Sequence, residues 1–239
     1  MTARVDEIAP DVFRISTLDD GPAGGFTFNQ FLLRAEEPVL VHSGPAEMFD
    51  GTLAAVARLL PVERLRWLSY SHVEGDESGA VPQWLGVAPH AQLLLGASGS
   101  TLSTGSPPDR TIRTVEEDEV VDLGGKRLRV LPTPHVPHGW DAALWFEEDR
   151  GTLLASDLFT QPGDGPAVTD DDLIERSMAG EELFGYTAPT TLFGPTVRRL
   201  AELPVRTIAC MHGSSFDGHC PNQLRDLADA MERRFATSA

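Results

Sequence analysis

The chain has 239 residues, 41% of them hydrophobic, and carries 19 basic against 36 acidic side chains, for a formal net charge of −17. A surface of this sign repels phosphate backbones and anionic lipid, which makes nucleic acid and membrane surfaces poor candidate partners. The length suits a single domain over residues 1–239, and without an apolar run of about 18 residues or a signal peptide the sequence predicts a cytoplasmic protein.

Short apolar runs with β-branched residues alternate with helical patterns in the first half of the chain. FTFNQFLLRA at 26–35 and PVLVHS at 38–43 are typical of strands. DGTLAAVARLL at 50–60 predicts a helix that Asp50 caps and Pro61 stops. LRWLSYS at 65–71 predicts the next strand. The alternation indicates an α/β protein with helices on the outer faces of a sheet.

The second half continues this alternation between two irregular regions. GASGSTLSTGSPPD at 96–109 predicts a loop, and QPGDGPAVTDDD at 161–172 predicts a candidate lid ahead of a helix beginning near Asp171. Further strands are expected at 127–133, 151–156 and 205–211. The closing helix, at 223–235, has an apolar face of Leu224, Leu227, Met231 and Phe235.

Four of the predicted strands are followed by a residue that can bind a metal. The first leads into His72, the second into His135 and His138, the third into Asp157 and the fourth into His212. Because the ends of strands on one edge of a sheet converge, these side chains should form one pocket. Imidazoles and carboxylates in this ratio suit a pair of first-row transition ions: iron, manganese or zinc.

The stretch SHVEGDESGA at 71–80 strengthens the metal hypothesis. His72, Glu74 and Asp76 occupy alternate positions, and alternate residues of a turn that leaves a strand can point to one side. A single histidine at a strand end is more often structural than a ligand. The triplet and the other strand ends together favour a metal site.

These motifs resemble those of a known family. HVEGDESG is similar to the HxExDxSG variant of the HxHxDH motif of the metallo-β-lactamase fold, the variant found in flavodiiron proteins and their oxygen-binding di-iron relatives. HGWDAALW, LLASDLFTQ and CMHGSSF resemble the family's later ligand segments. The resemblance implies a metallo-β-lactamase-like αβ/βα four-layer sandwich. Hydrolases of this superfamily usually place His where this chain has Glu74, and a carboxylate there favours iron.

The resemblance also implies a ligand set. One ion would be bound by His72, Glu74 and His138 and a second by Asp76 and His212, with Asp157 bridging them. His135 competes with His138, but only His138 keeps the family's spacing to Asp141. His135 would then stand behind the ligands, where it orients one of them or lines the pocket.

Two positions depart from the resembled pattern. Glu77 stands where the family usually has a second His, so it either adds negative charge to the site or supports the ligands from behind. His42, in VLVHSGP, replaces an Asp that normally supports the ligand loop through hydrogen bonds. A histidine at this position is still able to form such bonds.

The resemblance leads to two hypotheses about function. Flavodiiron proteins carry a flavodoxin domain after this fold, and no such domain follows the helix through Phe235, so we expect no flavin in cis and a separate redox partner. The first hypothesis is a di-iron protein that binds or reduces a small ligand, O2 or NO. A homodimer is one expected state of such a protein. The second is metal-dependent hydrolysis of an ester, thioester or related acyl substrate, for which Met178, Phe184 and Tyr186 either shape a pocket or belong to the core. A metal-free interaction module is disfavoured because every implied ligand position is filled.

Overall fold

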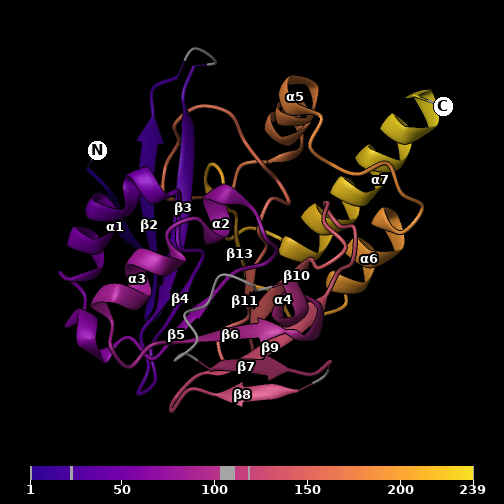
Figure 1. Cartoon of the computed structure of the whole chain (residues 1–239). Helices are drawn as coiled ribbons and strands as arrows, with labels where there is room; N and C mark the ends of the chain where they lie inside the picture. Colours follow the sequence, from indigo (N-terminus) through magenta and orange to yellow (C-terminus); the bar gives the residue numbers. More distant parts are fainter. Residues whose placement is uncertain (1, 22–23, 103–110, 118, 239) are drawn as a thin grey trace.

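The computed structural model describes residues 2–21, 24–102, 111–117 and 119–238. Within these residues the chain forms two mixed sheets of seven strands each (Figure 1). The first sheet has the order β1-β2-β3-β4-β5-β6-β7. Its strands are β1 (Arg4–Ala9), β2 (Val12–Asp19), β3 (Phe26–Leu33), β4 (Val39–Val41), β5 (Trp67–Ser69), β6 (Gln92–Gly96) and β7 (Ile112–Val115).

The second sheet is built from the C-terminal half of the chain. Its order is β12-β14-β13-β11-β10-β9-β8. Its strands are β8 (Val120–Asp122), β9 (Arg127–Pro132), β10 (Ala143–Glu147), β11 (Thr152–Leu154), β12 (Val168–Thr169), β13 (Thr207–Ala209) and β14 (Ser215–Phe216).

Helices cover the outer face of each sheet. The helices are α1 (Phe49–Val56), α2 (Gly75–Ser78), α3 (Val81–Val87), α4 (Ala97–Leu102), α5 (Ile174–Phe184), α6 (Phe193–Leu200) and α7 (Cys220–Ser238), with single 3-10 turns at Ala46–Met48 and Val62–Arg64. Figure 1 shows α1 and α3 beside the first sheet and α6 and α7 beside the second. None of the described helices combines the length and apolarity that crossing a membrane requires.

Three buried clusters correspond to the three interfaces of these layers. One joins the first sheet to α1 and α3 through residues such as Val56 and Trp84, and another joins the second sheet to α6 and α7 through Val197 and Leu224. The third contains side chains of both sheets, Phe31 and Trp145 among them. The predicted four-layer αβ/βα sandwich is therefore confirmed.

The six strands predicted from the sequence are all present, each shorter than its apolar run. The edges of other elements were predicted wrongly. Asp50 lies in the first turn of α1 and does not cap it, since the helix begins at Phe49 after Met48. Residues 97–102 form α4 where a loop was expected, and the rest of that loop, 103–109, lies outside the described residues.

The predicted lid segment also differs from expectation. Residues 161–172 contain the short strand β12, which pairs in parallel with β14, and the following helix begins at Ile174 instead of near Asp171. The segment is thus fixed to the edge of the second sheet.

Strand direction places the predicted ligands at one edge of the sandwich. β4 and β5 are parallel, as are β11 and β13, and β9 runs in the same direction as β11 because antiparallel β10 lies between them. The two sheets are also joined there, since the Ala143 N–H donates to the Ser71 carbonyl and the Asn29 N–H to that of Met211. The segments after β5, β9, β11 and β13 therefore meet in space.

Candidate metal centre

The segments after β5, β9 and β11 bring four side chains together. The possible ligand atoms of His72, Glu74, His138 and Asp157 all lie within 4.8 Å of one another. The Nε2 atoms of His72 and His138 lie 2.8 and 2.9 Å from Glu74 Oε2, and each is 3.5 Å from Asp157 Oδ2. Two imidazoles thus face two carboxylates across one small space.

A second set of contacts surrounds the other oxygen of Asp157. His212 Nε2 lies 3.3 Å from Asp157 Oδ1 and 3.2 Å from Asp76 Oδ2. The carboxylate of Asp157 therefore has one oxygen toward His72 and His138 and the other toward His212. This is the arrangement that a carboxylate shared between two adjacent cation positions requires.

His212 is fixed by the start of β3, which contains Phe26 and Thr27. Its Nδ1 donates to the Thr27 carbonyl at 2.8 Å, so Nε2 keeps its lone pair for the site. The Thr27 hydroxyl accepts from the next backbone N–H, that of Gly213. The Phe26 ring stacks on the His212 ring at 4.1 Å between centroids.

The loop that carries His72, Glu74 and Asp76 is held from behind by two buried carboxylates. Glu77 accepts from the N–H groups of Ser71 and His72 at 2.8 and 2.9 Å. Asp141, from the segment after β9, accepts from the Val73 N–H at 2.9 Å. These bonds fix the backbone from which the ligand side chains project.

The electrostatics of the cluster are dominated by its carboxylates. Burial alone would lower the pKa of His72, but Glu77, Glu74 and Asp157 outweigh it and raise that pKa to about 10. Burial is likewise overcome at His212, where Asp157 and Asp76 raise the pKa to about 9. Hydrogen bonds from His138 and His72 lower the pKa of Glu74.

The pKa values of His138 and Glu77 are shifted as well. The pKa of His138 is raised because Glu74 and Asp157 outweigh the effect of its burial. Burial opposes ionisation of Glu77, yet His42 and His72 outweigh it and the pKa of Glu77 lies below its usual range. The site is therefore a concentration of negative charge that needs cations or protons.

These residues fit a pair of cations. Asp157 Oδ2 and Asp76 Oδ1 are buried without a hydrogen-bond partner among the described residues, which is costly for a carboxylate oxygen. Neutral imidazole nitrogens facing carboxylate oxygens would place lone pairs against lone pairs. A bound cation removes both penalties, so the donor set is a His/Glu/Asp metal site.

A cavity of about 190 Å³ opens over the cluster. Its lining combines the ligand side chains with an aromatic wall. Phe26 and Phe184 contact each other with ring centroids 5.1 Å apart, and Tyr186 lies edge-on to His138 at 6.2 Å. The described residues that line the cavity are Phe26, Glu74, Asp76, His138, Asp157, Thr160, Phe184, Tyr186 and His212.

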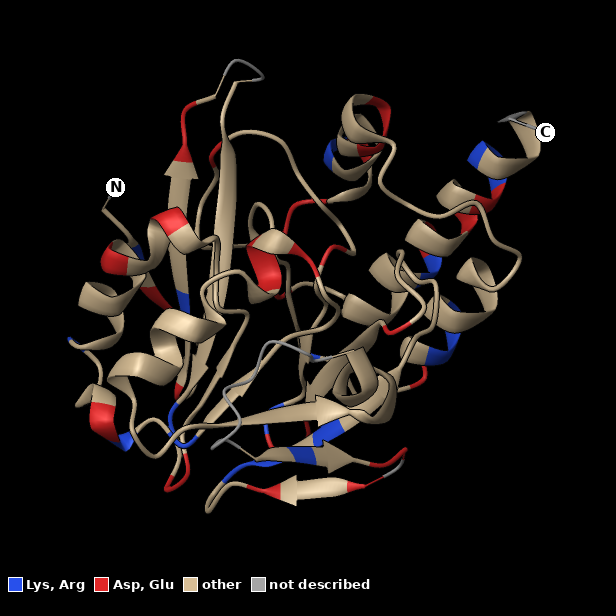
Figure 2. Ribbon diagram, in the orientation of Figure 1, with Lys and Arg blue, Asp and Glu red and all other residues tan. Residues whose placement is uncertain are grey.

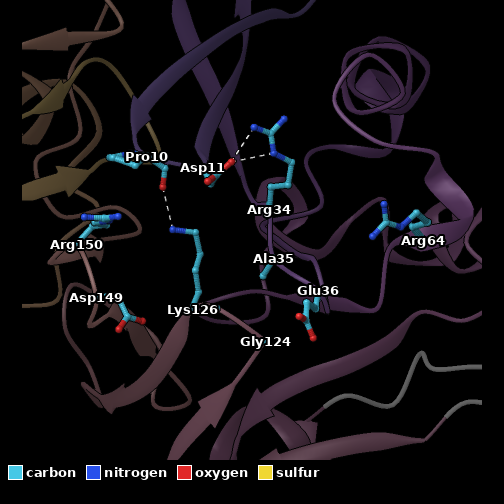
Figure 3. A pocket seen from close by; sticks show the side chains of 11 residues that line it. Pro10, Asp11, Arg34, Ala35, Glu36, Arg64, Gly124, Lys126, Asp149 and Arg150 are labelled. Atoms are coloured by element: carbon cyan, nitrogen blue, oxygen red, sulfur yellow. Dashed lines mark hydrogen bonds and ion pairs between the residues drawn. The ribbon is translucent and has the colours of Figure 1, made fainter.

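A larger cavity, of about 580 Å³, lies at the opposite edge of the sandwich, between the turns that precede β2, β4, β9 and β11 (Figure 3). Its charges are mostly engaged. The Arg34 guanidinium donates twice to Asp11, and Lys126 donates to the Pro10 carbonyl at 2.8 Å. Asp149 accepts from the backbone and side chain of Arg127.

Figure 2 shows the acidic α2 at the candidate site and basic positions mainly at the opposite edge and on α6 and α7.

Six predicted ligands converge and one alternative does not. His72, Glu74, Asp76, His138, Asp157 and His212 surround the site. His135 is exposed, and the described lining of the cavity does not include it. The expected lid at 161–172 does not line the cavity either. Phe184 and Tyr186 line it instead.

Two features of the site had a weak sequence signal or none. The Thr27 carbonyl that orients His212 is a backbone group, which any residue could supply. The two departures from the resembled pattern, His42 and Glu77, are in contact, with His42 Nδ1 3.3 Å from Glu77 Oε2. Because the two residues are 35 positions apart, local sequence patterns do not predict this contact.

Comparison with known proteins places the fold. The sequence profile described as ODP family beta lactamase matches residues 26–213. A diflavin flavoprotein of Nostoc sp. is 28% identical over 94% of this chain, and the type A flavoprotein fprA of Rhodobacter capsulatus is 31% identical over 64% of it. This chain spans about two fifths of the length of both relatives.

The metal-soaked flavodiiron core of Flv1 from Synechocystis sp. PCC6803 is one of the similar solved structures. It superimposes with a TM-score of 0.84 at 18% identity, over 97% of this chain and 61% of that one. At this identity the likeness establishes the fold alone.

Proposed function

Since the chain belongs to the ODP family beta lactamases and carries a His/Glu/Asp metal site, we propose that it is a di-iron protein that binds or reduces O2 or NO with electrons from a separate donor. The match covers only about two fifths of the length of the relatives named flavoproteins, so the activity is a proposal for this chain. When bound, a pair of irons would supply the electrons that reduce a diatomic ligand.

The observation that carries the proposal is the position of Asp157. Its two oxygens face separate histidine sets, which supports two adjacent cation positions and not one. His72, Glu74 and His138 would hold the first ion, and Asp76 and His212 the second, with Asp157 shared. The Thr27 carbonyl keeps the His212 Nε2 lone pair available for this role.

Glu74 supports iron over zinc. Its Oε2 lies within 2.9 Å of two imidazole nitrogens, so a carboxylate completes a position that would be nitrogen-rich with a third histidine. Harder, more anionic ligands suit iron or manganese better than zinc, and they stabilise the higher oxidation state.

The cavity supports a small ligand. With a volume of about 190 Å³ it lies below the range of about 300–1,000 Å³ that drug-sized molecules occupy. An aromatic wall, from Phe26, Phe184 and Tyr186, leaves room for a diatomic beside the ligand atoms. This argues against an acyl substrate of appreciable size.

Elemental analysis followed by anaerobic reduction tests the proposal. The protein, expressed with iron available, should contain about two irons per chain. The reduced form should change its visible spectrum on exposure to O2 or NO. Two zincs per chain together with ester or thioester hydrolysis would favour the hydrolase instead, and irons inert to both gases would also reject the proposal.

A further inference from the structure

Glu77 joins two of the segments that carry candidate ligands. It is fully buried, and its Oε2 accepts from the N–H groups of Ser71 and His72. Its Oε1 accepts from the Ser156 hydroxyl, and Ser156 directly precedes Asp157. One side chain therefore contacts both the segment after β5 and the segment after β11.

A third strand end also meets Glu77. His42 follows β4 and is buried, with Nδ1 3.3 Å from Glu77 Oε2 and no ring hydrogen bond to another described residue. The Ser43 N–H donates to the Glu77 carbonyl at 2.6 Å. The imidazole thus lies directly against this carboxylate.

The backbone around Glu77 is strained. His42 and Ser156 have φ values of 63° and 50°, in the left-handed region that residues other than glycine seldom adopt. Such conformations persist where the surrounding structure fixes them, often at functional sites. Both residues contact Glu77, which indicates that this carboxylate fixes them.

We propose that Glu77, with His42 packed against it, is the positioning residue for both halves of the metal centre. His72 Nδ1 lies 3.5 Å from Glu77 Oε1, so the carboxylate favours a proton on Nδ1 and leaves the Nε2 lone pair for a metal. Through Ser156 it fixes the backbone from which the Asp157 side chain projects. The inference rests on the metal site of the proposed function.

The test is the affinity of the metal-free protein for ferrous iron, titrated anaerobically, in wild type and Glu77→Gln. The amide has the shape of the carboxylate but can present N–H to His72 Nδ1, which would favour the wrong tautomer. We expect binding to weaken about 10- to 100-fold. Glu147→Gln is the matched control, because Glu147 is also buried, accepts from two backbone N–H groups and has Lys126 3.8 Å away, but lies at the opposite edge. It should bind iron like the wild type.

A second variant separates positioning from a general loss of stability. His42→Asn removes the imidazole that lies against Glu77, and Asn tolerates the left-handed backbone at position 42. We expect it to weaken iron binding several-fold while the protein stays folded. The Co²⁺ visible spectrum should shift in His42→Asn and in Glu77→Gln, and should stay that of the wild type in Glu147→Gln.

If Glu77→Gln does not fold, Ser156→Ala removes only the hydroxyl contact, and we expect it to weaken iron binding several-fold. Wild-type affinity in a folded Glu77→Gln or in Ser156→Ala would overturn the inference, and wild-type affinity in His42→Asn would overturn the role of His42. Failure of the wild type itself to bind iron would reject the proposed function instead.

Discussion

The two edges of the sandwich use the same residue types in different ways. At the opposite edge, carboxylates meet cations and backbone donors: Arg34 pairs with Asp11, and Glu147 accepts from two N–H groups beside Lys126. At the candidate centre, carboxylates meet imidazoles, and an oxygen of Asp157 is buried without a hydrogen-bond partner among the described residues. The larger cavity lies at the edge whose charges are mostly paired.

This difference shows that unpaired charge identifies a site better than cavity size. A carboxylate paired with arginine is already neutralised, whereas one that faces an imidazole Nε2 needs a proton or a metal ion. Substitutions at the two edges should therefore differ in their effects on metal content, on the pH dependence of stability and on access to the metal.

The largest effect should follow from removing the shared carboxylate. Asp157→Ala takes a ligand from both cation positions, so metal content by elemental analysis should fall from about two ions per chain to near none. Asp149→Ala, at the opposite edge, and His135→Ala should leave it unchanged. Loss of metal in the His135 variant would instead make His135 a ligand.

A pH dependence should distinguish the edges next. In the metal-free protein the pKa values of His72 and His212 rise from 6.5 to about 10 and about 9 because the carboxylates outweigh burial. Their protonated forms stabilise the fold fully below about pH 6.5, and this stabilisation is lost as the pH rises through 9 and 10. The midpoint of thermal unfolding should therefore fall between about pH 7 and about pH 10.

Two comparisons check the origin of this slope. His72→Gln should flatten it, and so should bound metal, which replaces the protons. No histidine is among the described residues that line the opposite cavity, so Asp149→Ala should keep the wild-type slope. If the pH dependence is unchanged in His72→Gln, titratable groups other than His72 cause it.

A smaller effect is expected at the aromatic wall. Phe184 is 48% exposed and contacts Phe26, so Phe184→Ala should cost little stability while opening the mouth of the cavity. We expect a chelator to remove metal several-fold faster, with metal content unchanged, as measured by stopped-flow absorbance. Leu192→Ala is the control, because Leu192 is also exposed, at 46%, and does not line the cavity. Equal chelation rates in Phe184→Ala and wild type would show that this ring does not control access.

The smallest effect belongs to the opposite edge. Arg34→Ala breaks an ion pair whose side chains are 46% and 49% exposed, and such pairs contribute about 0–1 kcal/mol. Chemical denaturation should detect at most that loss, and iron affinity should not change. A change in iron affinity would mean that the two edges are coupled.

The sequence was sufficient for the fold and for the convergence of the site because each relevant residue follows a strand. His72, His138, Asp157 and His212 could be placed together once the strands were recognised, since parallel strands end at one edge. The motif around Glu74 and Asp76 indicated the protein family that the chain resembles. These inferences depend on local pattern and on general rules of sheet topology.

The remaining features depend on contacts that local pattern does not contain. The Ser- and Gly-rich residues 97–102 form a helix against β6 and β7 despite poor propensity, because tertiary packing overrides it. The contact of His42 with Glu77 depends on the pairing of β4 with β5. The orientation of His212 depends on a carbonyl, which has no residue identity.

The bond from His212 to the Thr27 carbonyl joins residues 185 positions apart. Contacts of such separation form late and slow the folding of a chain, because a long loop must close before they contribute. During synthesis the centre cannot be complete until residue 212 has left the ribosome. The metal ions would therefore bind to a nearly complete fold. They would stabilise the folded chain and would not nucleate its folding.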